Sequence, residues 1–214
     1  MMGTCARQFL LCALLGFCGL SAEVQGKPLS LFDHGQHCVA YRAKKTMFLV
    51  RSVQVVGRNC EVSTKIIPIP GGKSYFEATV PVSEFESGES QRDRDVRKVL
   101  KASTHPNMVF RSEERTMEEW KAIQPGAPIQ LKGELEIGGK KTPIQAQAQL
   151  VRTEGGLEID GVVKTRFEDL GLKPPQLVMG LMAQVKQDLE LHFHFLGNRT
   201  LGFNRFESMG ASSE

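Results

Sequence analysis

Apolar and polar residues alternate along most of the chain, which is the pattern of a β-sheet with one dry and one wet face. Between residues 189 and 195 the odd positions are Leu or Phe, whereas the even positions are Glu190, His192 and His194. The same period of two recurs at residues 75–82, 131–137, 144–150 and 157–163. The pattern therefore predicts a series of antiparallel strands, and it puts both histidines on a solvated outer face.

Glycine pairs separate several of these runs, at residues 138–139 and 155–156, and they predict tight hairpin turns. Eight or so such strands are compatible with a closed barrel or with a sandwich. Short hairpins in simple order favour an up-and-down barrel. We therefore predict an all-β fold with minor α content, an eight-stranded antiparallel barrel with one or two short helices.

Two segments break the alternation and predict helices. Residues 90–102 carry Val96, Val99 and Leu100 at helical spacing, and Ser90 with Asp93 resembles a capping box. A second, apolar helix is predicted after Pro174-Pro175, where proline suits a first turn.

The N-terminal residues 1–26 have the pattern of a signal peptide rather than of folded structure. Arg7 supplies a positive start, an apolar stretch runs from Phe9 to Leu20, and cleavage is expected after Gly26. Residues 27–206 then suit one domain, and the small polar residues 207–214 suit a loose tail. We expect an exported protein.

The formal net charge of +3 is too balanced to indicate nucleic-acid binding, and no basic stripe interleaved with aromatic residues supports it. We therefore expect no nucleic-acid partner. A mild basic bias is compatible with transient contact with an anionic membrane surface, although an ordinary solvated surface explains it as well.

Two cysteines, Cys38 and Cys60, remain after the predicted cleavage. In an oxidising exported compartment two such thiols usually pair, so we predict a Cys38–Cys60 disulfide. Two buried free thiols are the alternative.

The order of several short motifs carries a family resemblance. They are Ser87-Gly88, Arg92-Asp93, His105-Pro106, Phe110, and the hairpin sequence Gly133-x-Leu135-x-Ile137-x-Gly139. Taken together, and over most of the chain after about residue 36, they resemble the YceI family of bacterial polyisoprenoid-binding, lipocalin-like proteins. A later stretch, residues 166–171, resembles another family motif but places Leu170 where an aromatic residue is usual.

The resemblance implies an extended eight-stranded, lipocalin-like barrel in a periplasmic protein, with a lipid tunnel inside. It also implies that a homodimer would be unsurprising. For the Arg92-Asp93 pair it suggests a polar gate at the tunnel mouth, whereas the residues themselves suggest a helix-opening ion pair, with Asp93 favoured by the helix N-terminus. We prefer the second interpretation.

Whether the predicted barrel is hollow or filled depends on the small residues of its inward faces. They are Ala78, Gly133, Ala146, Ala148 and Gly161. An eight-stranded barrel can hold one slim ligand or be filled by its own side chains, and large neighbours such as Phe76, Phe193 and Phe195 could fill it. The resemblance favours the tunnel. The predicted lipid contacts are Phe76, Ala78, Val80, Phe110, Leu135, Ile137, Ala146, Ala148, Leu177, Leu181, Leu189, Leu191 and Phe193.

Candidate metal ligands are few. His34, His37 and Cys38 cluster near the predicted mature N-terminus, but a firm site needs three or four converging ligands. No nucleophile elbow, zinc-protease motif or phosphate loop is present in the sequence. We therefore expect no metal, no cofactor and no enzymatic activity.

The sequence thus predicts a non-enzymatic periplasmic binding or carrier protein for a polyisoprenoid-type lipid, a quinone or a polyprenyl phosphate. The alternatives are a filled-barrel interaction protein tied to envelope stress, and a metal binder that uses the histidine cluster.

Overall fold

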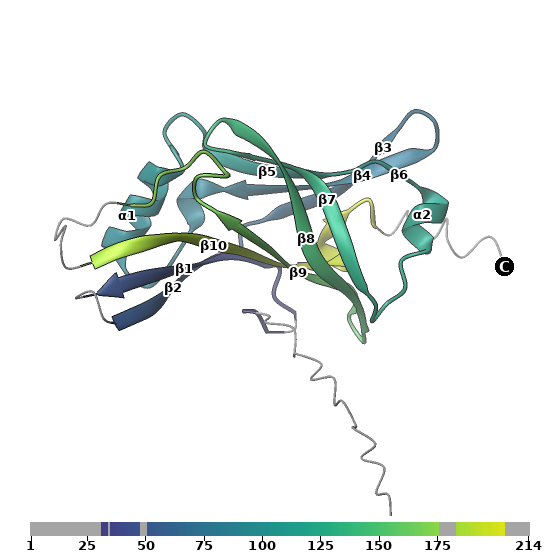
Figure 1. Ribbon diagram of the computed structural model, residues 1–214. Coiled ribbons are helices and arrows are strands. Elements are labelled where there is room, and N and C mark those ends of the chain that lie inside the picture. The colour runs from purple at the N-terminus through teal and green to yellow at the C-terminus, as the bar shows by residue number, and fades with distance from the viewer. Residues whose placement is uncertain (1–30, 34, 48–50, 176–182, 204–214) are drawn as a thin grey trace, which may run out of the picture.

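The computed structural model of the chain describes residues 31–33, 35–47, 51–175 and 183–203. These residues form one curled sheet of eleven strands with two short α-helices (Figure 1). The strands are β1 (Cys38–Met47), β2 (Arg51–Asn59), β3 (Ser63–Ile69), β4 (Lys73–Pro81), β5 (Asn107–Ser112), β6 (Arg115–Thr116), β7 (Pro128–Ile137), β8 (Lys140–Thr153), β9 (Gly156–Arg166), β10 (Ala183–Leu196) and β11 (Thr200–Leu201). The helices are α1 (Ser90–Val99) and α2 (Met117–Lys121), with 3-10 turns η1 (Val82–Glu84) and η2 (Gly197–Arg199). The predicted all-β class with minor helix is confirmed.

The described strands outnumber the predicted eight. Two of them, β6 and β11, have only two residues each, which is too short for alternation to be visible in a sequence. β3 has the sequence STKIIPI, in which consecutive isoleucines and Pro68 hide the period of two.

The strand order in the sheet is β11-β3-β4-β5-β7-β8-β9-β10-β1-β2, and β6 pairs with β4. Neighbours are antiparallel except for β11 with β3. Within the described residues no ladder joins β2 to β3 or β11. Instead, Arg58 near the end of β2 forms an isolated bridge with Glu86, through two backbone hydrogen bonds of 2.8 Å. The lipocalin-like sheet is therefore a half-barrel, and the segment after β4 covers its seam.

The predicted glycine turn between β7 and β8 is present. Gly138 and Gly139 have φ angles of 57° and 82°, which glycine adopts without strain. A side chain at Gly139 would also lie 2.5 Å from the His105 ring. The turn sets the register that places Ala146 of β8 opposite Leu131 of β7.

Helix α1 begins at the predicted residue but is capped differently. Its N-cap is Glu89, without a side-chain capping bond, so the predicted Ser90–Asp93 capping box is wrong. The Asp93 carboxylate instead accepts hydrogen bonds from the backbone N–H and the hydroxyl of Ser87. Asp93 therefore holds the turn before the helix. A capping box does occur at α2, between Thr116 and Glu119, a helix that the sequence analysis missed.

Figure 1 shows α1 at the end of the sheet where β1 ends and β10 begins, and α2 at the opposite end beside β6. Val96 and Val99 of α1 pack against the main core, which includes Leu135 and Ile137 of β7. No described helix is long and apolar enough to cross a membrane. The helix predicted after Pro175 falls on residues 176–182, outside the described ranges.

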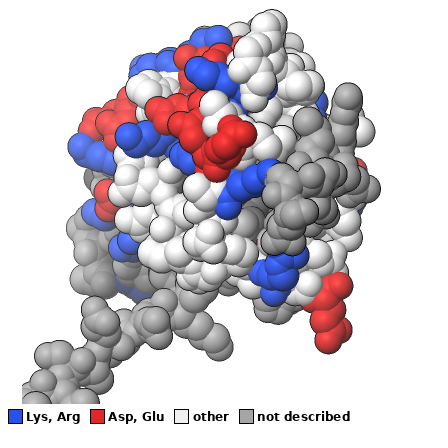
Figure 2. Space-filling view, turned by 90° about the vertical axis from the view of Figure 1, so that its right-hand side faces the viewer, with Lys and Arg blue, Asp and Glu red and all other residues white. Residues whose placement is uncertain are grey.

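The face of the molecule that carries α2 has a mixed surface. Figure 2 shows its basic and acidic side chains interspersed over the upper part, above an area without charges. Ion pairs such as Lys73–Glu114 contribute to this mixture. Such a pattern is typical of an ordinary solvated surface.

Candidate functional site

An apolar cavity lies inside the curl of the sheet, beside α1. Its wall is formed by residues of β1, β4, β5, β7, β8, β9 and β10, together with the inner side of α1. The space open to the centre of a water molecule is about 210 Å³. The wall is overwhelmingly apolar, so the cavity suits a hydrocarbon guest better than a polar one.

Nine of the predicted lipid contacts line this cavity. They are Ala78, Val80, Phe110, Leu135, Ile137, Ala146, Leu189, Leu191 and Phe193. Phe76 and Ala148 are not part of its wall: Phe76 packs on Phe195, and Ala148 belongs to a core cluster with Leu131 and Val163. Leu177 and Leu181 fall outside the described residues. That any of these side chains contacts a lipid stays a prediction.

The inward glycines do not enlarge the cavity as expected. A Cβ atom on Gly161 would lie 2.1 Å from the ring of Phe193, and one on Gly133 would lie 2.5 Å from the ring of Phe110. Each glycine therefore accommodates an aromatic ring that lies across the strand. Ala78 and Ala146 do border open space, so part of the small-residue prediction is right and part is wrong.

Aromatic rings seal the inner end of the cavity. Phe193 stacks on Phe195 with ring centroids 5.2 Å apart, and Phe195 lies 5.5 Å from Phe76. Phe76 in turn lies 6.5 Å from Phe110. These separations are those of favourable aromatic pairs. The filled arrangement weighed in the sequence analysis is thus realised at one end of the half-barrel only.

Behind the aromatic seal, a ring of hydrogen bonds ties together segments that are distant in sequence. The backbone N–H of Leu196 donates to His37 Nδ1 at 3.0 Å, and the Thr200 hydroxyl donates to the Leu196 carbonyl at 2.9 Å. Thr64 Oγ1 lies 2.9 Å from Thr200 Oγ1 and 3.2 Å from His37 Nε2. Because the Thr200 proton goes to the carbonyl, Thr64 donates to Thr200 and His37 Nε2–H donates to Thr64.

This ring fixes His37 as a neutral imidazole, since its Nδ1 must stay free of a proton to accept from Leu196. Burial lowers the pKa of His37 to about 4, and the positive charge of Arg199 contributes in the same direction. His37 therefore serves the fold rather than a metal.

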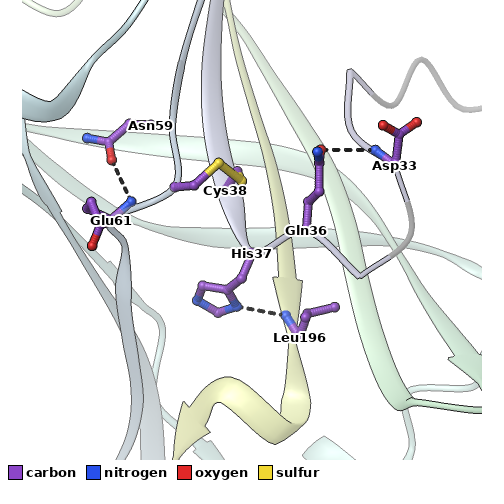
Figure 3. The surroundings of a disulfide bond; sticks show 8 residues. Asp33, Gln36, His37, Cys38, Asn59, Glu61 and Leu196 are labelled. Atoms are coloured by element: carbon purple, nitrogen blue, oxygen red, sulfur yellow. Dashed lines mark hydrogen bonds between the residues drawn. A yellow bond between two sulfur atoms is a disulfide. The ribbon is translucent and has the colours of Figure 1, made fainter.

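The predicted disulfide between Cys38 and Cys60 is confirmed, and it lies directly beside His37 (Figure 3). It joins the start of β1 to the residue after β2, with a Cα–Cα distance of 4.1 Å. Next to it, the Asn59 amide donates to the Pro81 carbonyl at 2.7 Å. The bridge closes the open end of the β1–β2 hairpin, and the hydrogen bond joins that end to β4.

The two histidines of β10 lie on the outer face of the sheet but are buried, contrary to the solvated position expected. His192 and His194 are only 3% and 1% exposed. His194 Nε2 lies 3.2 Å from a carboxylate oxygen of Glu158, and Phe32 packs edge-on against its ring at 6.3 Å. The N-terminal segment therefore covers this part of the outer face, which the sequence pattern could not show.

The opposite end of the cavity is its polar mouth. The charged and amide-bearing side chains that line it are Lys44, Lys45, Glu89, Gln91, Arg92 and Asp95. Arg92 pairs with Glu89 and donates to the Ser87 carbonyl at 3.2 Å. Arg92 thus holds the turn that opens α1, but its ion-pair partner is Glu89 and not the expected Asp93. Arg92 also lies at the mouth of the cavity.

Tyr41, on the inward face of β1, extends its phenol toward this mouth. Gly57 of β2 makes room for it, because a Cβ there would lie 2.6 Å from the hydroxyl oxygen. That oxygen is buried and makes no hydrogen bond of acceptable geometry with a described residue. Burial raises the pKa of the Tyr41 phenol, although Arg92 and a polar contact with Ser87 oppose the shift.

The comparisons with known proteins agree with this architecture. The model of the YceI-like domain matches residues 32–196. The chain belongs to the YceI-like family. No curated protein matches it significantly.

Two solved structures share the YceI-like fold with this chain at low identity. The polyisoprenoid-binding domain from Saccharophagus degradans is 12% identical, with a TM-score of 0.55, covering 73% of this chain and 91% of that one. Burkholderia cenocepacia BcnA is 17% identical, with a TM-score of 0.51, covering 72% of this chain and 94% of that one. At these identities the likeness shows the fold alone.

The late motif of this YceI-like chain forms the turn that follows β9. Phe167 lines the cavity, and Leu170, at the position where the family usually has an aromatic residue, is completely buried. Leu170 packs in the main core, while Leu172 reaches the cavity wall. The departure from the family pattern therefore affects the core behind the wall and not the wall itself.

Among the described residues, no group of three or more His, Cys, Asp or Glu side chains is placed to hold a metal ion. Cys38 is in the disulfide, so its sulfur is not available as a ligand. His34 lies outside the described residues. The cavity wall carries only Glu89 and Asp95 as acids, both at the mouth.

Proposed function

We propose that this YceI-like protein binds one polyisoprenoid-type amphiphile without chemically transforming it. The apolar chain occupies the cavity, and the polar head stays at the mouth beside α1. The observation that carries the proposal is the combination of an overwhelmingly apolar interior with one polar opening. Family membership supports it, as does a solved structure of the same fold described as a polyisoprenoid-binding domain.

The energetics favour a ligand with a long hydrocarbon chain. Each CH2 group transferred from water to this wall contributes about 0.8 kcal/mol. A prenyl chain can therefore bind firmly with few polar contacts, and the aromatic seal at Phe193 and Phe195 sets how far it enters.

We further propose that the protein works in the periplasm as a carrier or store of such a lipid. The Cys38–Cys60 disulfide suits an oxidising compartment. The signal-like sequence of residues 1–26 points the same way.

The test is native mass spectrometry of the protein purified from its own periplasm, followed by organic extraction and identification of the lipid. The proposal expects a stoichiometric prenyl-chain lipid. A clean apo mass, with no uptake of added quinone or polyprenyl phosphate, would instead favour a filled-barrel interaction protein.

A matched pair of variants tests whether the cavity is the binding site. Ala146 and Ala148 are buried on the same face of β8, but only Ala146 borders the cavity. Ala146→Phe is expected to abolish lipid retention, and Ala148→Phe to leave it unchanged in the protein that remains folded by circular dichroism. Equal retention in both folded variants would contradict the cavity as the site.

A further inference from the structure

The mouth of the cavity has an excess of hydrogen-bond donors. Its acids already have partners: Glu89 pairs with Arg92, and Asp95 accepts from Gln91 at 3.1 Å. Lys98 also lies 3.9 Å from Asp95. The acceptor groups of the mouth are therefore engaged by the protein itself.

Three donors of β1 at the mouth are not engaged in this way by a described residue: Lys44, which is exposed, and Lys45 and Tyr41 on the inward face. Lys45 is half-buried, lines the cavity, and has no described carboxylate within 4.0 Å of its ammonium group. Tyr41 lies four residues earlier, and its buried hydroxyl makes no hydrogen bond of acceptable geometry with any part of the chain that the structure describes. Tyr41, Ala43 and Lys45 all line the cavity, and the pairing of β1 with β2 is continuous over this stretch. The pairing of β1 with β10 shifts in register between Ala43 and Lys45.

The placement of Lys45 is unusual for a strand that lines an apolar cavity. Val39, Tyr41 and Ala43 precede it on the inward face, and Val185 and Val53 are its neighbours on β10 and β2. An anionic guest would meet the ammonium group of Lys45 at this edge of the apolar wall. A hydrogen bond to a charged partner is also stronger than one between neutral groups.

We infer that the amphiphile bound here carries an anionic, acceptor-rich head group of the phosphate class, held by Lys45 and Tyr41, rather than a neutral quinone or alcohol. This inference rests on the proposed lipid-binding function, because it assigns the head group of the same ligand. A phosphate monoester offers several acceptor oxygens, which match one ammonium and one phenol at the edge of an apolar cavity.

The experiment compares two probes with the same fifteen-carbon prenyl chain, farnesol and farnesyl monophosphate. Their affinities are measured by isothermal titration calorimetry on delipidated protein. The phosphate is expected to bind about tenfold more tightly or better, as is typical of a buried charge-assisted hydrogen bond. This preference should weaken as the ionic strength is raised, because the Lys45 ammonium is partly accessible to salt.

Single substitutions test which side chains cause the preference for the phosphate. Lys45→Met is expected to bring the two affinities to within about twofold of one another. Tyr41→Phe should lower the affinity for the phosphate several-fold. Lys164→Met is the control, because it removes the same charge from the exposed outer face of β9 and should leave the preference intact.

Equal affinities of the two probes in the unaltered protein would overturn the assignment of the head group and leave the lipid-binding proposal standing. A preference lost equally in Lys164→Met and Lys45→Met would overturn it as well, since overall charge would then explain the preference. If neither probe binds, the proposed function itself fails.

Discussion

The two ends of the half-barrel are built with opposite chemistry. At one end the Cys38–Cys60 disulfide, the hydrogen-bond ring around His37 and the stacked phenylalanines leave little free space. At the other end alanines border a cavity of about 210 Å³, and the mouth holds unengaged donors. The end with the disulfide stabilises the fold, and the end with the cavity leaves space for a ligand.

The difference has an energetic reason. Side chains that line an unfilled apolar cavity lose packing contacts, and this costs stability. Covalent and hydrogen-bonded closure of the sealed end offsets part of that cost. We therefore expect changes at the sealed end to affect stability, and changes at the hollow end to affect binding.

The largest effect is expected from removing the disulfide. In the chain-entropy model, a bridge that closes 22 residues of separation stabilises by about 3 kcal/mol. The double variant Cys38→Ala/Cys60→Ala should lose about that much free energy of unfolding, measured by urea denaturation. The folded fraction should still retain lipid, because neither cysteine lines the cavity. Loss of lipid from well-folded protein would show that the two ends are coupled.

The next effect is a pH dependence that originates at His37. Its pKa in the folded protein, about 4, lies below the ordinary value of 6.5. As the pH falls from 6.5, the unfolded chain binds a proton at His37 and the native protein does not, so stability decreases until the pH reaches about 4. Between pH 6.5 and 5 this amounts to about 2 kcal/mol.

Urea midpoints measured across that range would check this dependence. His37→Gln is the comparison, because it removes the titrating group and should flatten the slope. Acidic groups with lowered pKa values, such as Glu77 and Glu190, act at lower pH and so fall outside the range chosen. The same slope in both proteins would mean that another group causes it.

Alternation along the strands explains how much of this site was predictable. A period of two assigns each residue to a face, and nine of the residues assigned to the inward face line the cavity. The period of two does not show which side chains lie opposite a residue across the cavity, because that depends on pairing between strands that are distant in sequence. Ala146 and Ala148 look the same in sequence and belong to one core cluster, yet only Ala146 borders the cavity.

Contacts between segments far apart in sequence were hidden for the same reason. His37 and Thr64 are 27 residues apart, and Thr64 and Thr200 are 136 apart, so no local pattern connects them. The burial of His194 depends on Phe32, which comes from the segment before β1. Gly133 and Gly161 indicated that little space is occupied at their own positions. They did not indicate that the rings of Phe110 and Phe193 fill that space.

Replacing Ala146 or Ala148 is expected to change stability by an intermediate amount, and the two variants should differ from one another. Ala148→Phe must displace well-packed neighbours, and overpacking of this kind costs about 1–3 kcal/mol. Ala146→Phe can extend its ring into open space, so it should cost less, about 1 kcal/mol or below. Thermal unfolding of the two delipidated variants would measure the difference. The reverse order would mean that the cavity is not free space in the absence of lipid.

The smallest effect, and the most specific, is expected from Tyr41→Phe. The substitution removes only the hydroxyl, which is buried and makes no hydrogen bond of acceptable geometry, so the folded protein loses little. Relief of an unsatisfied buried donor stabilises by up to about 1 kcal/mol, so the melting temperature of delipidated protein should stay constant or rise slightly. A measurable fall would show that the phenol serves the fold through Ser87. A rise combined with weaker binding of the phosphate probe would show a polar group kept at a cost in stability because a ligand uses it.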